Sequence, residues 1–156
     1  MRKLSIDEIK SSFIVDDLEH WVDPEISNKK WDDCDFIAWK HPKAGHYFLC
    51  VESENDLFGV VVQMNSGAGN VGANCDFCFA RNENLGVKAA FIDTVDNPRR
   101  KIGIHCCGDL KCSERVRGLS QATFMYETIT TGRRIERLQE KVSRFTRKIF
   151  AGRAAS

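Results

Sequence analysis

The chain has 156 residues and a formal net charge of +1, and 42% of its residues are hydrophobic. A chain of this length fits one domain with its own core, and this composition excludes intrinsic disorder. The N-terminal residues are amphipathic and partly acidic. We therefore expect no secretory signal, transit peptide or membrane span, and a cytoplasmic protein.

The charge is divided unevenly along the chain. Residues 1–60 hold thirteen Asp and Glu against seven Lys and Arg, whereas residues 61–156 hold nine against sixteen. This asymmetry indicates either an anionic partner for the second half or an electrostatic match between the two halves. The sequence leaves both interpretations open.

Residues 1–30 are expected to form one helix followed by a loop. Ser5 to Glu8 read Ser-Ile-Asp-Glu, a capping box in which each end residue can bond to the backbone amide of the other. Apolar residues then recur at helical spacing as far as Ile14, which predicts a helix of about ten residues. The following polar stretch contains Pro24 and is expected to be a loop.

Residues 34–65 are expected to form a β-meander. Three runs rich in aromatic and β-branched residues are separated by turn-forming segments at 41–45 and 52–56. A glycine-rich connector follows at 66–74. It lacks the Gly-Lys-Ser/Thr ending of a phosphate-binding loop, so we assign no phosphate site to it.

Four of the seven cysteines have the spacing of metal ligands. Cys75 and Cys78 form a C-x2-C pair, and Cys107 and Cys112 form a C-x4-C pair. Two such pairs can place four thiolates around one zinc ion. A thioredoxin-like redox pair would need to open a helix after a parallel strand, whereas this C-x2-C follows the glycine-rich connector. We therefore predict one structural Zn²⁺.

The identity of one ligand is ambiguous on spacing alone. Cys106 and Cys107 are adjacent, and neighbouring side chains on a strand face opposite sides, so only one of them reaches the ion easily. His105 would share a face with Cys107 and is a further candidate. The remaining cysteines, Cys34 and Cys50, have no ligand-like spacing and are expected to be ordinary reduced thiols.

The sequence around these cysteines predicts a treble-clef zinc finger over residues 75–118. Two β-type runs flank a polar turn at 96–100, which predicts a hairpin. A short helix should follow, with Asp109 as its N-cap and Gly118 at its end. The second cysteine pair then falls where a strand ends and this helix begins.

Residues 120–150 are expected to form a basic amphipathic helix. Apolar residues recur at intervals of three and four from Ile135 to Ile149, and basic residues form a second stripe from Arg133 to Lys148. One stripe should pack on the domain, and the basic one should be exposed. We therefore expect one domain over 1–156 in the α+β class. It should hold a small antiparallel sheet, a four-cysteine treble clef, and flanking N- and C-terminal helices.

The cysteine region resembles the treble-clef region of the elongation-factor-G-binding proteins, the fusidic-acid-resistance family. The segments that show this resemblance are CDFC at 75–78 and HCCGDLKCSERVRG at 105–118. The family pattern C-x-D-L-x-C-S, followed by V-R-G, is filled here by Cys107, Asp109, Leu110, Cys112, Ser113, Val116, Arg117 and Gly118. This pattern favours Cys107 as the ligand. The run from Trp39 to Ala44 also resembles the family, so the resemblance covers roughly residues 30–150.

The resemblance implies a partner as well as a fold. Longer family members carry a helical-bundle domain first, for which this chain has no room, so it looks like a stand-alone C-terminal domain. In the family that domain grips elongation factor G, and binding frees the factor from drug-stalled ribosomes. For this chain the resemblance implies binding to elongation factor G or the ribosome, with fusidic-acid tolerance as a further expectation.

The candidate partner-binding residues are basic, with one aromatic anchor. They are Arg99, Arg100 and Lys101 at the expected hairpin tip, Arg137 and Lys141 on the last helix, and Tyr126. Phe79 and Phe124 are further aromatic candidates, for which ordinary core packing is an equal explanation.

Two other classes of function compete with a protein-binding module. The same basic residues could bind RNA phosphates, although the near-neutral net charge disfavours a dedicated DNA-binding protein. Four thiolates leave no open position on zinc, and no nucleophile–base pair stands out in the sequence, so we expect no enzyme.

Overall fold

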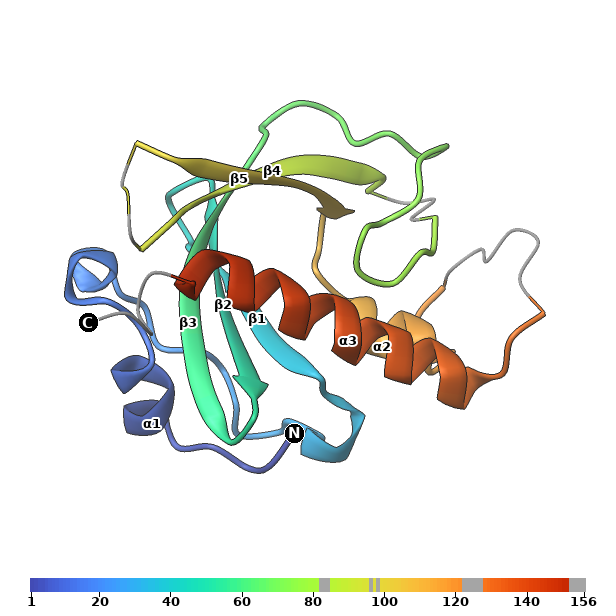
Figure 1. Cartoon of the computed structure of the whole chain (residues 1–156), viewed down its shortest axis with the longest axis horizontal. Coiled ribbons are helices and arrows are strands. Elements are labelled where there is room, and N and C mark those ends of the chain that lie inside the picture. Colours follow the sequence, from blue (N-terminus) through green and yellow to red (C-terminus); the bar gives the residue numbers. More distant parts are fainter. Residues whose placement is uncertain (82–84, 96, 98, 122–127, 152–156) are drawn as a thin grey trace.

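The computed structural model describes the chain except for residues 82–84, 96, 98, 122–127 and 152–156. Its five strands form one antiparallel sheet in the order β1-β2-β3-β4-β5 (Figure 1). The strands are Phe36–Lys40 (β1), His46–Ser53 (β2), Asp56–Met64 (β3), Val87–Asp93 (β4) and Lys101–Cys107 (β5). The helices are Ile6–Ser11 (α1), Cys112–Val116 (α2) and Thr131–Phe150 (α3), with 3-10 turns at Val15–Leu18 and Trp31–Asp33.

The fold has the predicted α+β class, with the sheet flanked by an N-terminal and a C-terminal helix (Figure 1). The three strands expected in residues 34–65 are present as β1 to β3. The hairpin expected between the cysteine pairs is present as β4 and β5. One long-range feature was not foreseen: β3 pairs with β4 through Gln63↔Phe91 and Met64↔Ala90, which joins meander and hairpin into one sheet.

Helix α1 is shorter than predicted. The capping box is formed, with the Ser5 hydroxyl accepting from the Glu8 amide at 3.2 Å and the Ser5 amide donating to the Glu8 carboxylate at 2.8 Å. The helix nevertheless ends at Ser11 and is six residues long. The carbonyl of Ser12 accepts from the amide of Gly59 in β3, so the sheet takes the acceptor that a further helical turn would use.

The two faces of the sheet carry two hydrophobic clusters. Successive side chains of β2 point to opposite faces, so Phe48 and Cys50 lie in one cluster and Leu49 and Val51 in the other. The smaller cluster packs against α1. The larger one receives the apolar stripe of α3, whose buried residues are Leu138, Val142, Phe145 and Ile149, together with the cysteine segment.

Helix α3 starts later than the predicted boundary at residue 120. Thr130 has an extended backbone and its side chain accepts from the amide of Arg133, so it is the N-cap. Residues 120–121 and 128–130 have no helical structure. None of the described helices combines the length and the apolar character needed to cross a membrane.

Candidate metal centre

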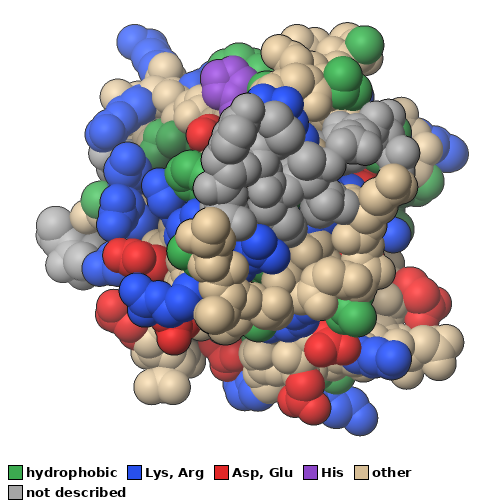
Figure 2. Space-filling model, turned by 90° about the vertical axis from the view of Figure 1, so that its right-hand side faces the viewer, with side chains coloured by type: hydrophobic (Ala, Val, Ile, Leu, Met, Phe, Trp, Pro, Cys, Tyr) green, Lys and Arg blue, Asp and Glu red, His purple; other side chains and the backbone are tan. Residues whose placement is uncertain are grey.

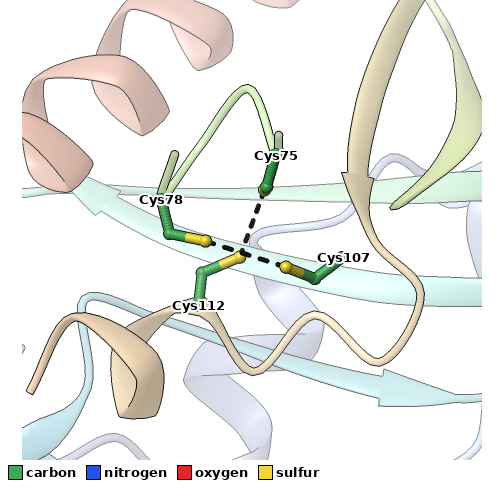
Figure 3. Close-up of side chains that lie close together, drawn as sticks. All are labelled: Cys75, Cys78, Cys107 and Cys112. Atoms are coloured by element: carbon green, nitrogen blue, oxygen red, sulfur yellow. Dashed lines mark hydrogen bonds between the residues drawn. The ribbon is translucent and has the colours of Figure 1, made fainter. Parts of the chain in front are cut away.

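The four predicted cysteines come together in the larger core. Their sulfur atoms all lie within 4.8 Å of one another, and each residue is at most 1% exposed (Figure 3). The distance between the Sγ atoms is 3.8 Å for Cys75 and Cys112 and 3.7 Å for Cys78 and Cys107. Four sulfurs about 2.3 Å from a zinc ion form a tetrahedron with edges of about 3.8 Å. The arrangement therefore fits a structural zinc ion, as predicted.

The first pair of ligands sits in a tight turn, the zinc knuckle, which we define as residues 75–80. The Phe79 amide donates to the Cys75 carbonyl at 2.9 Å, and the Cys75 amide donates to the Ala80 carbonyl at 3.0 Å. The Phe77 amide points at the Cys75 sulfur at 3.4 Å. Two backbone amides thus fix the turn, and that of Phe77 faces a sulfur that becomes negatively charged when it binds zinc.

The second pair spans the junction between β5 and α2. Cys107 is the last residue of the strand and Cys112 the first of the helix. Cys106 is fully buried but does not belong to the metal-binding group. Burial raises the pKa of the Cys106 thiol well above its usual range, so it is a neutral packing group.

His105 holds the knuckle through its backbone. Its amide donates to the Asp76 carboxylate at 2.7 Å, and its carbonyl accepts from the Asp76 amide at 2.8 Å. The imidazole is largely exposed, with 69% of the side chain accessible. The structure therefore places His105 outside the group of metal-binding side chains.

Asp109 does not cap α2, which corrects the sequence prediction. Lys111 occupies the N-cap position without a side-chain cap. The Asp109 carboxylate instead accepts from the Lys111 amide and from both terminal nitrogens of Arg115, at 2.7 and 2.6 Å. Leu110, between Asp109 and the N-cap residue, is buried and has a positive φ of 54°.

The Arg115–Asp109 ion pair lies in the wall of the zinc site. Burial by itself would raise the pKa of Asp109, but the hydrogen bonds from Arg115 and from the Lys111 amide, together with the charge of Arg115, outweigh it and hold that pKa below its ordinary value. Arg115 is only 2% exposed. Four thiolates and one Zn²⁺ carry two units of negative charge, so a buried guanidinium nearby offsets part of that charge.

The remaining pattern residues attach the zinc finger to the sheet. The Ser113 hydroxyl accepts from the Asp35 amide at 3.0 Å, and Arg117 donates to the Asp35 carboxylate at 2.6 and 3.2 Å. Gln139 of α3 donates to the same carboxylate at 2.9 Å. Gly118 then ends α2 with a φ of 70°. The Asp35 side chain, which sequence spacing did not single out, thus links β1, α2 and α3.

The predicted basic residues at the hairpin tip, Arg99, Arg100 and Lys101, are all exposed. The Lys101 ammonium pairs with Asp93 at 3.0 Å, so its charge is partly compensated. The same end of the hairpin touches α3, because the amide of Val95 donates to the carbonyl of Ile149 at 3.3 Å.

The basic stripe of α3 is less free than predicted. Arg137 and Lys141 are half-buried against the Phe79 ring, at 4.5 and 5.2 Å from its centroid. The Phe79 ring itself is 38% exposed, which removes core packing as its explanation. Tyr126 and Phe124 lie outside the described residues. Figure 2 shows Lys and Arg side chains gathered along one side of the face that it displays.

Residues 9–149 match a family model described as the FBP C-terminal treble-clef zinc-finger. No curated protein matches the chain. A solved structure titled "Structure of the fusidic acid resistance protein FusC" superposes with a TM-score of 0.59 at 14% sequence identity. The match covers 73% of this chain and 53% of that one, so the chain spans about half of FusC. Because the family model covers most of its residues, the chain belongs to the family of FBP C-terminal treble-clef zinc-finger domains.

Proposed function

We propose that this chain is a zinc-stabilised binding module for elongation factor G or the ribosome, and that it acts in the cytoplasm to modulate translation. Its family and its likeness to a fusidic acid resistance protein support this proposal. We propose fusidic-acid tolerance as a consequence of this binding to elongation factor G or the ribosome.

The observation that carries the proposal is the surface formed by Phe79, Arg137 and Lys141, which we call the knuckle surface. Phe79 has a positive φ of 62°. Such a backbone is strained for a bulky residue, at a cost of about 1–3 kcal/mol, whereas glycine adopts it without strain. The strained residue carries an aromatic ring that is partly exposed and lies against two cations.

Exposed aromatics next to arginine are typical of residues that dominate protein–protein binding energies. The zinc ion supports this role indirectly. It fixes the knuckle that presents Phe79, and it anchors α2. Four thiolates leave no position on the metal for a substrate, so we propose a binding module and not an enzyme.

RNA binding is the second candidate, and the exposed arginines of the hairpin tip favour it. The two candidates differ in their salt dependence. Contacts between Lys or Arg and phosphates release counterions, so RNA affinity would fall steeply with salt concentration. A protein interface centred on an aromatic ring would depend less on salt, with its rim charges acting mainly on the association rate.

The test is titration of labelled protein against purified elongation factor G, ribosomes and RNA, with the Phe79→Gly variant beside the wild type. Glycine relieves the backbone strain, so zinc content and thermal stability should be kept or improved. Binding to the factor or the ribosome should weaken by about tenfold or more.

Leu119→Ala is the matched control, because Leu119 is also an exposed apolar residue, at 59%, and lines a different hollow together with Phe36 and Leu110. Its affinity should equal that of the wild type. If Phe79→Gly binds both translation partners as tightly as the wild type, the knuckle surface is not the binding site. Saturable, salt-sensitive binding to RNA alone would favour the second candidate.

A further inference from the structure

The outer edge of β5 offers unpaired backbone groups. Among the strands that the structure describes, β4 is its one neighbour, and β5 lies at the end of the sheet. Beyond its two ends, the amide of Gly108 donates to Gly86 and the carbonyl of Arg100 accepts from Thr94. Because antiparallel pairing alternates, the even-numbered residues of β5 bond to β4, and Gly103 points its backbone groups away from the sheet.

One residue of the zinc knuckle already pairs with this outer edge of β5. The His105 amide donates to the Asp76 carboxylate, and the His105 carbonyl accepts from the Asp76 amide. Asp76 therefore bonds to both backbone groups of His105, as a residue of a sixth strand would. Among the residues that the structure describes, no backbone partner is found for Gly103, the next outward-facing residue.

A basic hollow of about 280 Å³ lies beside this edge. The edge residues Ile102, Gly103 and Ile104 form one wall, and α3 forms the other. The charged residues that α3 contributes are Lys141, Arg144 and Lys148. Gly103 is exposed and has no side chain that could cover its amide and carbonyl. In Figure 1, β5 is drawn above α3.

We propose that an acidic, extended segment of a partner protein adds to the free edge of β5 as a sixth strand. Its backbone pairs with Gly103, and alternate side chains point toward the lysines and the arginine of α3. The inference deepens the proposed function and rests on it only in requiring that the partner is a protein.

The chemistry of the hollow favours a peptide over a nucleic acid. Gly103 supplies a donor and an acceptor from one residue, which is the pattern of a strand and not of a phosphate. Unprotected edge strands readily accept a further strand, and the cations select its charge.

The test uses the substitution Gly103→Pro, which removes the outward amide hydrogen. Proline is tolerated on an edge strand where that hydrogen faces solvent. Gly103→Ala is the matched control. It keeps the amide, and its Cβ would meet the Phe91 ring at 3.6 Å, an ordinary contact. A third variant, Lys141→Glu with Lys148→Glu, reverses two charges on the α3 wall of the hollow and leaves β5 unchanged.

The probes are a capped eight-residue peptide alternating glutamate with valine, its lysine counterpart, and an eight-nucleotide oligouridine. With the zinc-loaded wild type, the acidic peptide should shift the amide resonances of residues 101–105 and 141–148 and slow hydrogen exchange at Gly103. Gly103→Pro should weaken binding by about fivefold or more, the effect of one lost hydrogen bond. Gly103→Ala should bind normally, and the double charge reversal should prefer the lysine peptide.

The outcomes separate this inference from the proposed function. If the acidic peptide leaves the Gly103 amide unchanged at millimolar concentration, or binds Gly103→Pro as tightly as wild type, strand addition is wrong. Oligouridine binding in place of the acidic peptide, unaffected by Gly103→Pro, would also overturn it. If the peptide binds the edge but elongation factor G and ribosomes do not bind the chain, the proposed function fails and strand addition stands.

Discussion

Removal of the Asp35 carboxylate should be among the most damaging single changes outside the zinc ligands. Its side chain is 1% exposed and accepts two hydrogen bonds from Arg117 and one from Gln139. Asp35→Ala leaves Arg117, whose side chain is only 12% exposed, without its carboxylate partner. Breaking a buried ion pair by removing one partner typically costs about 3–5 kcal/mol.

The lower end of this range applies here. Arg117 keeps a hydrogen bond to the Ser113 carbonyl at 3.0 Å, and its partial exposure admits some water. We therefore expect a loss of about 3 kcal/mol. For a chain of this length, that corresponds to a fall in melting temperature of about 6–12 °C.

The measurement is urea unfolding of the zinc-loaded protein at a fixed free zinc concentration, because zinc bound to the folded state adds to its stability. The midpoint should fall at an unchanged m-value. In a cycle with Arg117→Ala, the double variant should lose less stability than the two single variants combined, by about 0.5–3 kcal/mol.

The matched control is the pair formed by Arg133 and Glu136 on the surface of α3. Its N–O distance is also 2.6 Å, but the side chains are 73% and 62% exposed. Glu136→Ala should therefore cost less than about 1 kcal/mol. If Asp35→Ala costs no more than this control, the Asp35 network does not hold the zinc finger to the sheet, and burial does not strengthen this ion pair.

Three further predictions concern the metal and the N-terminus. The native protein should hold one zinc per chain by elemental analysis, and serine at Cys75, Cys78, Cys107 or Cys112 should weaken retention while Cys106→Ser should not. Full retention by Cys107→Ser would contradict this ligand set. Chelation should open residues 75–118 to hydrogen exchange and leave β1 to β3 protected, because the smaller hydrophobic cluster contains no zinc ligand. Uniform loss of protection would contradict this prediction. The Ser5 backbone hydrogen bond, with help from Arg2, lowers the pKa of Glu8 to about 2 from 4.5. The folded protein thus favours the ionised carboxylate, so its contribution to stability is present above pH 4.5 and disappears as the pH falls toward 2. Glu8→Gln should remove this part of the acid dependence in thermal melts, and identical pH profiles would refute the assignment.

The sequence by itself predicted the features that depend on neighbouring residues. Cys75 and Cys78 are close enough along the chain for one turn to bring both sulfurs to an ion, so their spacing is informative without a fold. The capping box at Ser5 and the apolar stripe of α3 are local in the same sense. The zinc ion, the strands and the flanking helices could therefore be expected from local patterns in the chain.

The resemblance added what spacing alone left open. Alternation along a strand showed that Cys106 and Cys107 face opposite ways but not which one faces the ion. The family pattern favoured Cys107, and the structure places that sulfur 3.7 Å from the sulfur of Cys78.

Tertiary structure alone decided the features that join distant segments. The end of α1 depends on Gly59, because a β3 amide takes the carbonyl that the next helical turn would need. Asp109 has the sequence position of an N-cap, but the fold brings Arg115 against it. The Asp35 carboxylate meets Arg117 and Gln139 from 82 and 104 residues away, and no local periodicity encodes such separations. Phe79 is exposed for the same reason, because the fold of the knuckle and the position of α3 together determine what its ring contacts.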